Sequence, residues 1–282
     1  MNNVISYSDI KSQLRKVVTP DDEVVVIFSG IWMFGSLLGK TVREVPDYLI
    51  STILESLGPE RTVIFPSYTY GYGSTRKFDL ITSKPETGVL PARALLRPEF
   101  VRTSSPLNSY LISGPRTQEA LGITDTSLWG DESVMGWFDK VSARICVLGE
   151  PWHQACTHYH RAEDILQVPY RYYKKFPGSI SKNGIYFSDC APTMFVRPMG
   201  CEMVRDYTGP AKIMKQRNMI LSGDNPSFPI ESALAPNIVK ACTDLLSDDI
   251  YAYVSNKNQL MEWVGRAMNE EVSKLSDGER VV

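Results

Sequence analysis

The segment VVVIF at residues 24–28, followed by VPDYLISTILESLGP at 45–59 and TVIFP at 62–66, reads as strand, loop, helix and strand. The first and last runs are continuous, apolar and rich in β-branched residues, as in strands buried on both faces. The middle segment has apolar residues at helical spacing and stops at Gly58-Pro59, which predicts a helix over 45–57. Such a βαβ-like unit predicts an α/β protein.

The rest of the chain continues this alternation. Patterns predict strands over 110–112 and 145–148, and the pair Asn183-Gly184 predicts a hairpin over 179–187. We expect a glycine-rich loop over 29–40 and a polar loop over 67–84. Helices are expected over 7–17, 88–96, 116–121, 156–166, 236–246 and 258–274. No repeat or linker divides the chain, so we predict a mixed three-layer αβα arrangement in one domain, residues 1–282, with a loop-rich C-terminal half and a C-terminal helix over 257–275.

Composition narrows the class of function. The 282 residues carry a formal net charge of −2, which argues against nucleic acid or an anionic membrane as a partner. The five cysteines form no CxxC pair, and residues 1–16 lack the apolar core of a signal peptide. We therefore expect reduced thiols and a cytoplasmic protein. A homodimer is the one assembly that we consider.

All three histidines of the chain fall within eight residues: His153, His158 and His160. They follow the predicted strand 145–148, and ligand sites of open α/β sheets collect at the carboxyl ends of strands. If residues 156–166 are helical, His160 can reach Glu163 or Asp164, and spacing alone does not choose between them.

A carboxylate on one ring nitrogen would fix the tautomer of His160 and leave the other nitrogen free to accept a proton. Thr157, three residues before His160, would supply a hydroxyl to a developing oxyanion. The alternative is a surface or packing pair. A further alternative is a metal-dependent hydrolase that uses the His153/His158/His160 cluster, although HxH on a helix directs its two rings to different faces.

Two further loops carry polar groups. Arg102 in the segment 102–109 could bind a phosphate through its planar guanidinium, and Ser29-Gly30 could present backbone N–H groups to an anion. Cys156 reads as a buried, inert thiol. The chain has no GxGxxG, P-loop or GxSxG motif, so nothing supports dinucleotide binding, NTP binding or a serine hydrolase.

From about residue 24 to residue 253, the sequence resembles the aminoglycoside 3-N-acetyltransferases. Five pieces occur in the family's order: FSGI (28–31) with Gly35, PSYT (66–69), TGVLP (87–91), RTSSPLNS (102–109), and CTHYHRAE (156–163) followed by Pro169-Tyr170. The last piece is similar to the family motif Asn-Thr-x-x-His-x-x-Glu. PSYT is similar to the family's Pro-Thr-Phe-Thr.

This resemblance implies an enzyme that transfers an acyl group, normally acetyl, from coenzyme A to an amino-sugar nitrogen, without a metal. It implies that His160 is the general base, that Glu163 orients it, and that Thr157 acts at the thioester oxygen. It also places coenzyme A along Ser29, Gly30 and Ile31 and along Arg102, Thr103 and Ser105. For the sugar we name Asn108, and Tyr68 and Tyr70 as stacking residues.

The chain departs from the family in its loops. Where the family has loop histidines, this sequence has Phe28, Ser105 and Asn108, and Cys156 replaces the Asn before Thr157. The base and its carboxylate remain, so we expect activity. The alternative is a non-catalytic, ligand-binding relative, in which the lost loop histidines mark lost chemistry. The altered loops leave the acceptor open between an aminoglycoside and an amino sugar of a polysaccharide or secondary-metabolite pathway.

Overall fold

The computed structural model describes residues 6–31, 41, 43–124 and 126–281. Most of the predicted glycine-rich loop, including Gly35, lies outside these described residues. Within them, no helix is long and apolar enough to cross a membrane.

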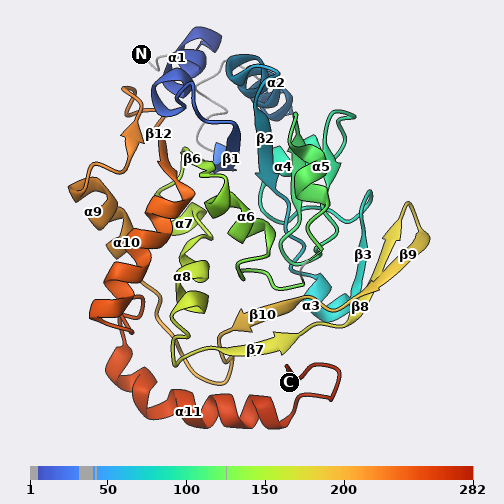
Figure 1. Ribbon diagram of the computed structural model, residues 1–282, viewed down its shortest axis with the longest axis vertical. Helices are drawn as coiled ribbons and strands as arrows, with labels where there is room; N and C mark the ends of the chain where they lie inside the picture. The colour runs from blue at the N-terminus through green and yellow to red at the C-terminus, as the bar shows by residue number, and fades with distance from the viewer. Residues whose placement is uncertain (1–5, 32–40, 42, 125, 282) are drawn as a thin grey trace.

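A seven-stranded mixed sheet forms the centre of the structure (Figure 1). Strand β1 (Val24–Ser29) runs parallel to β2 (Thr62–Pro66) on one side and to β6 (Arg144–Leu148) on the other. Antiparallel strands complete the order β11-β12-β6-β1-β2-β5-β4: β4 (Val101–Arg102), β5 (Tyr110–Ser113), β11 (Leu221–Ser222) and β12 (Ile230–Leu234). The predicted strands are confirmed, each within one residue at either end.

Helices cover both faces of this sheet, and the residues of β1 show why. Val25 and Ile27 face one apolar core, whereas Val24, Val26 and Phe28 face another, because side chains alternate along a strand. The first core is closed by α1 (Tyr7–Val17), α2 (Val45–Leu57) and α4 (Val89–Ala94). The second is closed by α5 (Thr117–Leu121), α6 (Val134–Lys140), α8 (Tyr159–Ile165), α9 (Thr208–Gln216) and α10 (Ala235–Asp248). The predicted αβα class is confirmed.

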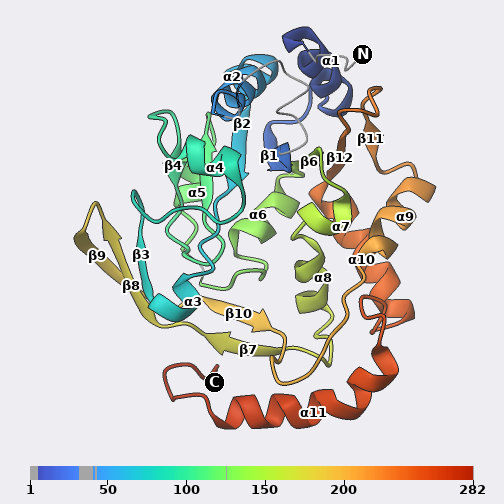
Figure 2. The ribbon, with the colours of Figure 1, turned by 180° about the vertical axis from the view of Figure 1, so that it is seen from behind.

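A smaller region of short strands adjoins the main sheet (Figure 2). Strands β3 (Lys77–Asp79), β8 (Gly178–Lys182) and β9 (Ile185–Cys190) form one sheet, and β7 (Tyr172–Lys175) pairs with β10 (Thr193–Val196). The predicted hairpin is confirmed: Asn183 and Gly184 have φ values of 51° and 79°, as a type I′ turn requires. Helix α11 (Lys257–Ser273) buries Leu260, Val264 and Ala267 in the second core.

Two local predictions are wrong. The segment 67–84 contains helix α3 (Tyr72–Thr75) and strand β3, whose partner β8 lies about a hundred residues later in the sequence. The helix expected over 156–166 begins only at Tyr159, as α8, because Cys156 takes an extended conformation with φ −85° and ψ 114°. A short helix that was not predicted, α7 (Trp152–Ala155), precedes it. The description of residues 1–282 as one acyltransferase domain stays a prediction.

Candidate active site

The three histidines lie in α7, in α8 and just before α8, in the segment that follows β6. Leu148, the last residue of β6, pairs with Ser29 at the end of β1, so this segment leaves the sheet where two parallel strands end. This is the edge at which open α/β sheets bind ligands.

His160 and Glu163 form the pair that the helical spacing allows. Nδ1 of His160 lies 2.6 Å from Oε2 of Glu163. The carboxylate of Glu163 is fully buried, while the His160 side chain is 20% exposed. Asp164, the other carboxylate within reach in the sequence, instead accepts a hydrogen bond from the Tyr173 hydroxyl at 2.6 Å. The structure thus pairs His160 with Glu163.

Arg171 is a third member of this cluster. Its Nη2 lies 2.8 Å from the same Oε2 of Glu163, and its Nη1 donates to the carbonyl oxygen of Phe195 at 3.0 Å. The Arg171 side chain is only 4% exposed. Two buried opposite charges therefore lie beside one imidazole, where a low local dielectric strengthens their effect.

These surroundings set the protonation states. Burial and the charge on Arg171 lower the pKa of His160 below its ordinary value, against the opposing effect of Glu163. Burial raises the pKa of Glu163, but Arg171 and the hydrogen bond from His160 outweigh it, so the net shift is downward. Nδ1 of His160 lies 2.6 Å from Glu163 Oε2 and 3.2 Å from the donor Nη2 of Arg171. An ionised carboxylate only accepts hydrogen bonds, so the shorter of these two contacts favours the tautomer with the proton on Nδ1. Nε2 then has a free lone pair at neutral pH, as a general base requires.

Aromatic rings fix the orientation of the imidazole. The rings of Trp129 and Tyr207 lie 5.1 and 5.6 Å from that of His160. Trp129 is held in turn by Arg161, whose Nη1 donates to the Trp129 carbonyl oxygen at 2.6 Å and whose Nε donates to Asp139.

Thr157 precedes α8 and lines a cavity of about 290 Å³, which we call the Thr157 cavity. Its walls are mixed polar and apolar: Phe28, Ser29, Tyr68, Tyr70, Thr87, Glu150, Gln154, Ala155 and Thr157. Three of the residues predicted from the sequence to bind ligands, Ser29, Tyr68 and Tyr70, thus share one cavity with Thr157. Cys156 is buried beside it, and burial raises the pKa of its thiol to about 12, which fits an inert cysteine.

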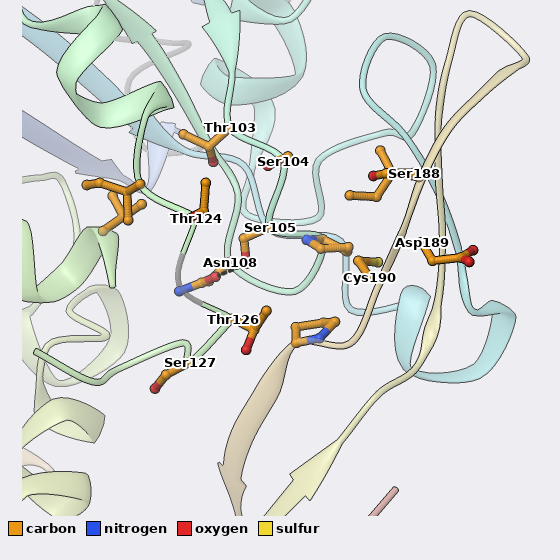
Figure 3. A pocket seen from close by; sticks show the side chains of 15 residues that line it. Thr103, Ser104, Ser105, Asn108, Thr124, Thr126, Ser127, Ser188, Asp189 and Cys190 are labelled. Atoms are coloured by element: carbon orange, nitrogen blue, oxygen red, sulfur yellow. Dashed lines mark hydrogen bonds between the residues drawn. The ribbon is translucent and has the colours of Figure 1, made fainter. Parts of the chain in front are cut away.

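A second cavity lies under the β8–β9 hairpin, and Figure 3 shows it; we call it the hairpin cavity. It measures about 260 Å³, and its lining mixes serine and threonine hydroxyl groups with apolar side chains; Thr103, Ser105 and Asn108 lie on one side and Asp189 on the other (Figure 3). The Ser105 hydroxyl donates to Asn108 Oδ1 at 2.6 Å, and Asn108 Nδ2 donates to the Leu128 carbonyl oxygen at 2.8 Å. Three further predicted residues therefore meet here, apart from the Thr157 cavity.

Arg102 and Gly30 do not offer the contacts that the sequence suggested. Every nitrogen of the buried Arg102 guanidinium donates within the protein, to Ser67, Thr69, Ser83 and Ser109. The N–H of Gly30 donates to the Leu148 carbonyl oxygen at 2.9 Å, and Ile31 packs against the first core. Arg102 thus holds the segment around Ser67 and Thr69 to Ser83 and Ser109. The backbone of Gly30 extends the hydrogen bonding between β1 and β6 by one residue.

The histidines do not converge on one point. His158 is fully buried, with Nε2 3.5 Å from Asp139 Oδ1, while His153 is exposed in α7. Within the described ranges, no group of three or more His, Cys, Asp or Glu side chains could hold a metal ion. The metal-hydrolase alternative therefore lacks a ligand set there.

Sequence reasoning missed Arg171 and Trp129. It also missed Tyr110, whose hydroxyl lies 3.0 Å from that of Tyr68 in the wall of the Thr157 cavity. Arg171 follows Pro169-Tyr170 at a spacing from Glu163 that no helix explains, because α8 ends at Ile165. Tyr110 lies in a strand, where a buried tyrosine reads as packing. Arg171 is marked by the burial of its charge, and burial is visible only in the folded structure.

Comparison of the sequence with protein families identifies one family. The profile of the aminoglycoside 3-N-acetyltransferase family matches residues 36–188, more than half of the chain. No curated protein matches the sequence.

Solved structures share the fold at low identity. The apoenzyme of aminoglycoside acetyltransferase AAC(3)-IVa is 20% identical, with a TM-score of 0.69 over 90% of this chain and 92% of that one. AAC-IIIb in its binary complex with CoASH is 15% identical, with a TM-score of 0.68 over 87% and 97%. YokD from Bacillus subtilis is 14% identical, with a TM-score of 0.69 over 87% and 100%. Together with the profile match, these findings show that the chain belongs to the aminoglycoside 3-N-acetyltransferase family of enzymes.

Proposed function

We propose that the protein transfers an acetyl group from acetyl-coenzyme A to the amino group of an amino sugar. The pairing of His160 with Glu163, one turn beyond Thr157, is the observation that carries this proposal. AAC-IIIb is seen with CoASH, and AAC(3)-IVa is seen with gentamicin and with apramycin. We propose the cytoplasm as the place of action; the five cysteines are free thiols.

The proposed step begins with the amine lone pair attacking the thioester carbonyl carbon. Nε2 of His160 accepts a proton from the attacking nitrogen, while Glu163 holds Nδ1 and stabilises the imidazolium. Thr157 donates to the oxyanion. The C–S bond then breaks, the amide forms, and the proton passes from His160 to the leaving thiolate.

The cavities suggest how the two substrates divide the site. The Thr157 cavity, which also contains Ser29, Tyr68 and Tyr70, suits the thioester end of coenzyme A because its hydroxyl groups can donate to a carbonyl oxygen. The hairpin cavity presents hydroxyl groups of serines and threonines (Figure 3), which suit a polar ligand such as an amino sugar. Thr103, Ser105 and Asn108 all line the hairpin cavity. This division keeps Asn108 as a proposed sugar contact, and it opposes the predictions that Thr103 and Ser105 contact coenzyme A and that Tyr68 and Tyr70 stack on the sugar. Ser105→Ala and Asn108→Ala should separate these roles through KM for acetyl-coenzyme A and KM for the amine.

The test is thiol release from acetyl-coenzyme A with aminoglycosides and with nucleotide-linked amino sugars. We expect release that depends on the amine, and the productive amine identifies the acceptor class. Absence of release with every amine, together with absence of coenzyme A binding by calorimetry, would refute the proposal. The homodimer stays a prediction that light scattering can check.

A further inference from the structure

Three hydroxyl groups form a chain that ends at Thr157. The Tyr110 hydroxyl lies 3.0 Å from the Tyr68 hydroxyl, and the Tyr68 hydroxyl lies 2.9 Å from Oγ1 of Thr157. Tyr110 is fully buried, Tyr68 is 3% exposed, and Thr157 lines the Thr157 cavity. This chain of three hydroxyl groups therefore runs from the apolar core to the wall of the Thr157 cavity.

The direction of the hydrogen bonds follows from counting donors and acceptors. In the described part of the chain, the only hydrogen-bond partner of the Tyr110 hydroxyl is the Tyr68 hydroxyl. A buried O–H needs an acceptor, so Tyr110 donates to Tyr68. Tyr68 then has its own proton left to donate, and it donates to Thr157.

Thr157 consequently accepts at Oγ1 and keeps its proton for another partner. Within the described residues, Oγ1 of Thr157 has no hydrogen-bond partner besides Tyr68. The opposite direction would leave the Tyr110 proton buried without an acceptor. Burial raises the pKa of both tyrosines, so both stay neutral donors over the working pH range.

We propose that Tyr68 and Tyr110 are positioning residues that direct the Thr157 hydroxyl proton into the Thr157 cavity, toward the thioester oxygen. This inference rests on the proposed acyl transfer. The resemblance gives Phe where this chain has Tyr68, so the chain of hydroxyls is not a feature of the family motif. Hydrogen-bonded hydroxyls polarise one another, which strengthens the terminal donor.

The experiment is a double-mutant cycle on Tyr68 and Thr157, read as kcat and KM for acetyl-coenzyme A. Thr157→Val should lower kcat about 100-fold, the usual effect of losing one oxyanion donor. Tyr68→Phe should lower kcat about tenfold, the equivalent of one hydrogen bond, with KM nearly unchanged. In the Thr157→Val background, Tyr68→Phe should have no further effect, because Tyr68 acts only through Thr157.

Tyr110→Phe should lower kcat less than Tyr68→Phe does, and its effect should also vanish in the Thr157→Val background. Tyr72→Phe is the matched control, since that buried tyrosine donates to the Phe176 carbonyl oxygen, outside the chain of hydroxyls. It should leave kcat unchanged.

The outcomes separate the two proposals. If Thr157→Val lowers kcat while Tyr68→Phe leaves it unchanged, the positioning role is wrong and the acyl-transfer mechanism stands. If the effects of Tyr68→Phe and Thr157→Val simply multiply, Tyr68 acts independently and the inference also fails. If Thr157→Val itself has no effect, the role of Thr157 in the proposed function fails, and the role of Tyr68 fails with it.

Discussion

Nδ1 of His160 and Oε2 of Glu163 lie 2.6 Å apart, and the Glu163 carboxylate is completely enclosed by the protein. The buried carboxylate faces groups inside the fold, among them His160, Arg171 and the Tyr170 hydroxyl. The arrangement resembles the base and orienting acid of other acyl-transfer enzymes, in which one ring nitrogen is held and the other is left to react.

His160→Ala should reduce turnover by at least about two orders of magnitude, because general-base catalysis contributes roughly 10²–10⁴ in rate. Coenzyme A binding, measured by calorimetry, should remain nearly intact, since the imidazole acts on the amine. Equal turnover in the variant and the wild type would exclude His160 as the base.

Glu163→Gln tests the orienting carboxylate. The amide cannot stabilise the imidazolium, so turnover should fall about tenfold or more. Asp164→Asn is the matched control: Asp164 bonds to the Tyr173 hydroxyl, and its loss should leave turnover within about twofold of wild type. A larger loss from Asp164→Asn than from Glu163→Gln would reverse the assignment.

Arg171 should control the pH dependence of the reaction. Its charge helps to hold the pKa of His160 below the ordinary value of about 6.5, so the base is free at neutral pH. Without this cation the pKa of His160 rises, and the acidic limb of kcat/KM should move to higher pH in Arg171→Met. Arg171→Lys keeps the charge and should keep the limb in place.

The same substitution should also affect stability. Arg171→Met leaves the buried Glu163 carboxylate without its positively charged partner, and removing one member of a buried ion pair typically costs about 3–5 kcal/mol. Thermal unfolding of both variants gives the control, because the pH profile is compared only for protein that is folded at the assay temperature. An acidic limb that stays fixed in folded Arg171→Met would contradict the electrostatic role.

The sequence predicted the local part of this site and not its long-range part. His160 and Glu163 share one short helix, so spacing limited the choice of partner to two carboxylates. Arg171, Trp129 and Tyr110 reach the site through tertiary packing, which periodicity does not record. Thr157 was expected on the helix, but it follows the extended Cys156 and lies before α8. Its hydroxyl partner, Tyr68, comes from the segment after β2.

The same difference between local and long-range signals applies to the fold. Strand β1 and helix α2 were predictable because buried strands and amphipathic helices have strong periodic signals. Strand β3 was missed since three residues carry no period, and its pairing with β8 spans about a hundred residues. Arg102 is an example among the predicted site residues. Its residue type suggested a contact with phosphate, but its side chain is buried and donates to groups of the protein such as the Thr69 hydroxyl.

Asp79 should anchor the β8–β9 hairpin to β3. Its carboxylate accepts hydrogen bonds from the Ser181 hydroxyl at 2.7 Å and from the backbone N–H groups of Thr82 and Gly184 at 2.9 and 2.7 Å. Burial raises the pKa of Asp79, but these hydrogen bonds outweigh it and hold the pKa well below the ordinary value. Asp79 therefore links the type I′ turn at Asn183-Gly184 to the strand that begins the small sheet.

Asp79→Asn should lower the free energy of unfolding by about 1–3 kcal/mol, because an amide nitrogen then faces groups that also donate. A depressed carboxyl pKa stabilises the fold above the unfolded value of about 3.9, and this contribution is lost as pH falls through the lower folded value. Urea unfolding at pH 7 and at pH 3 should thus show a smaller acid-induced loss for Asp79→Asn than for wild type. Asp189→Asn, an exposed acid on the neighbouring strand β9, should unfold like wild type at pH 7, and an equal loss in both variants would rule out the anchoring role.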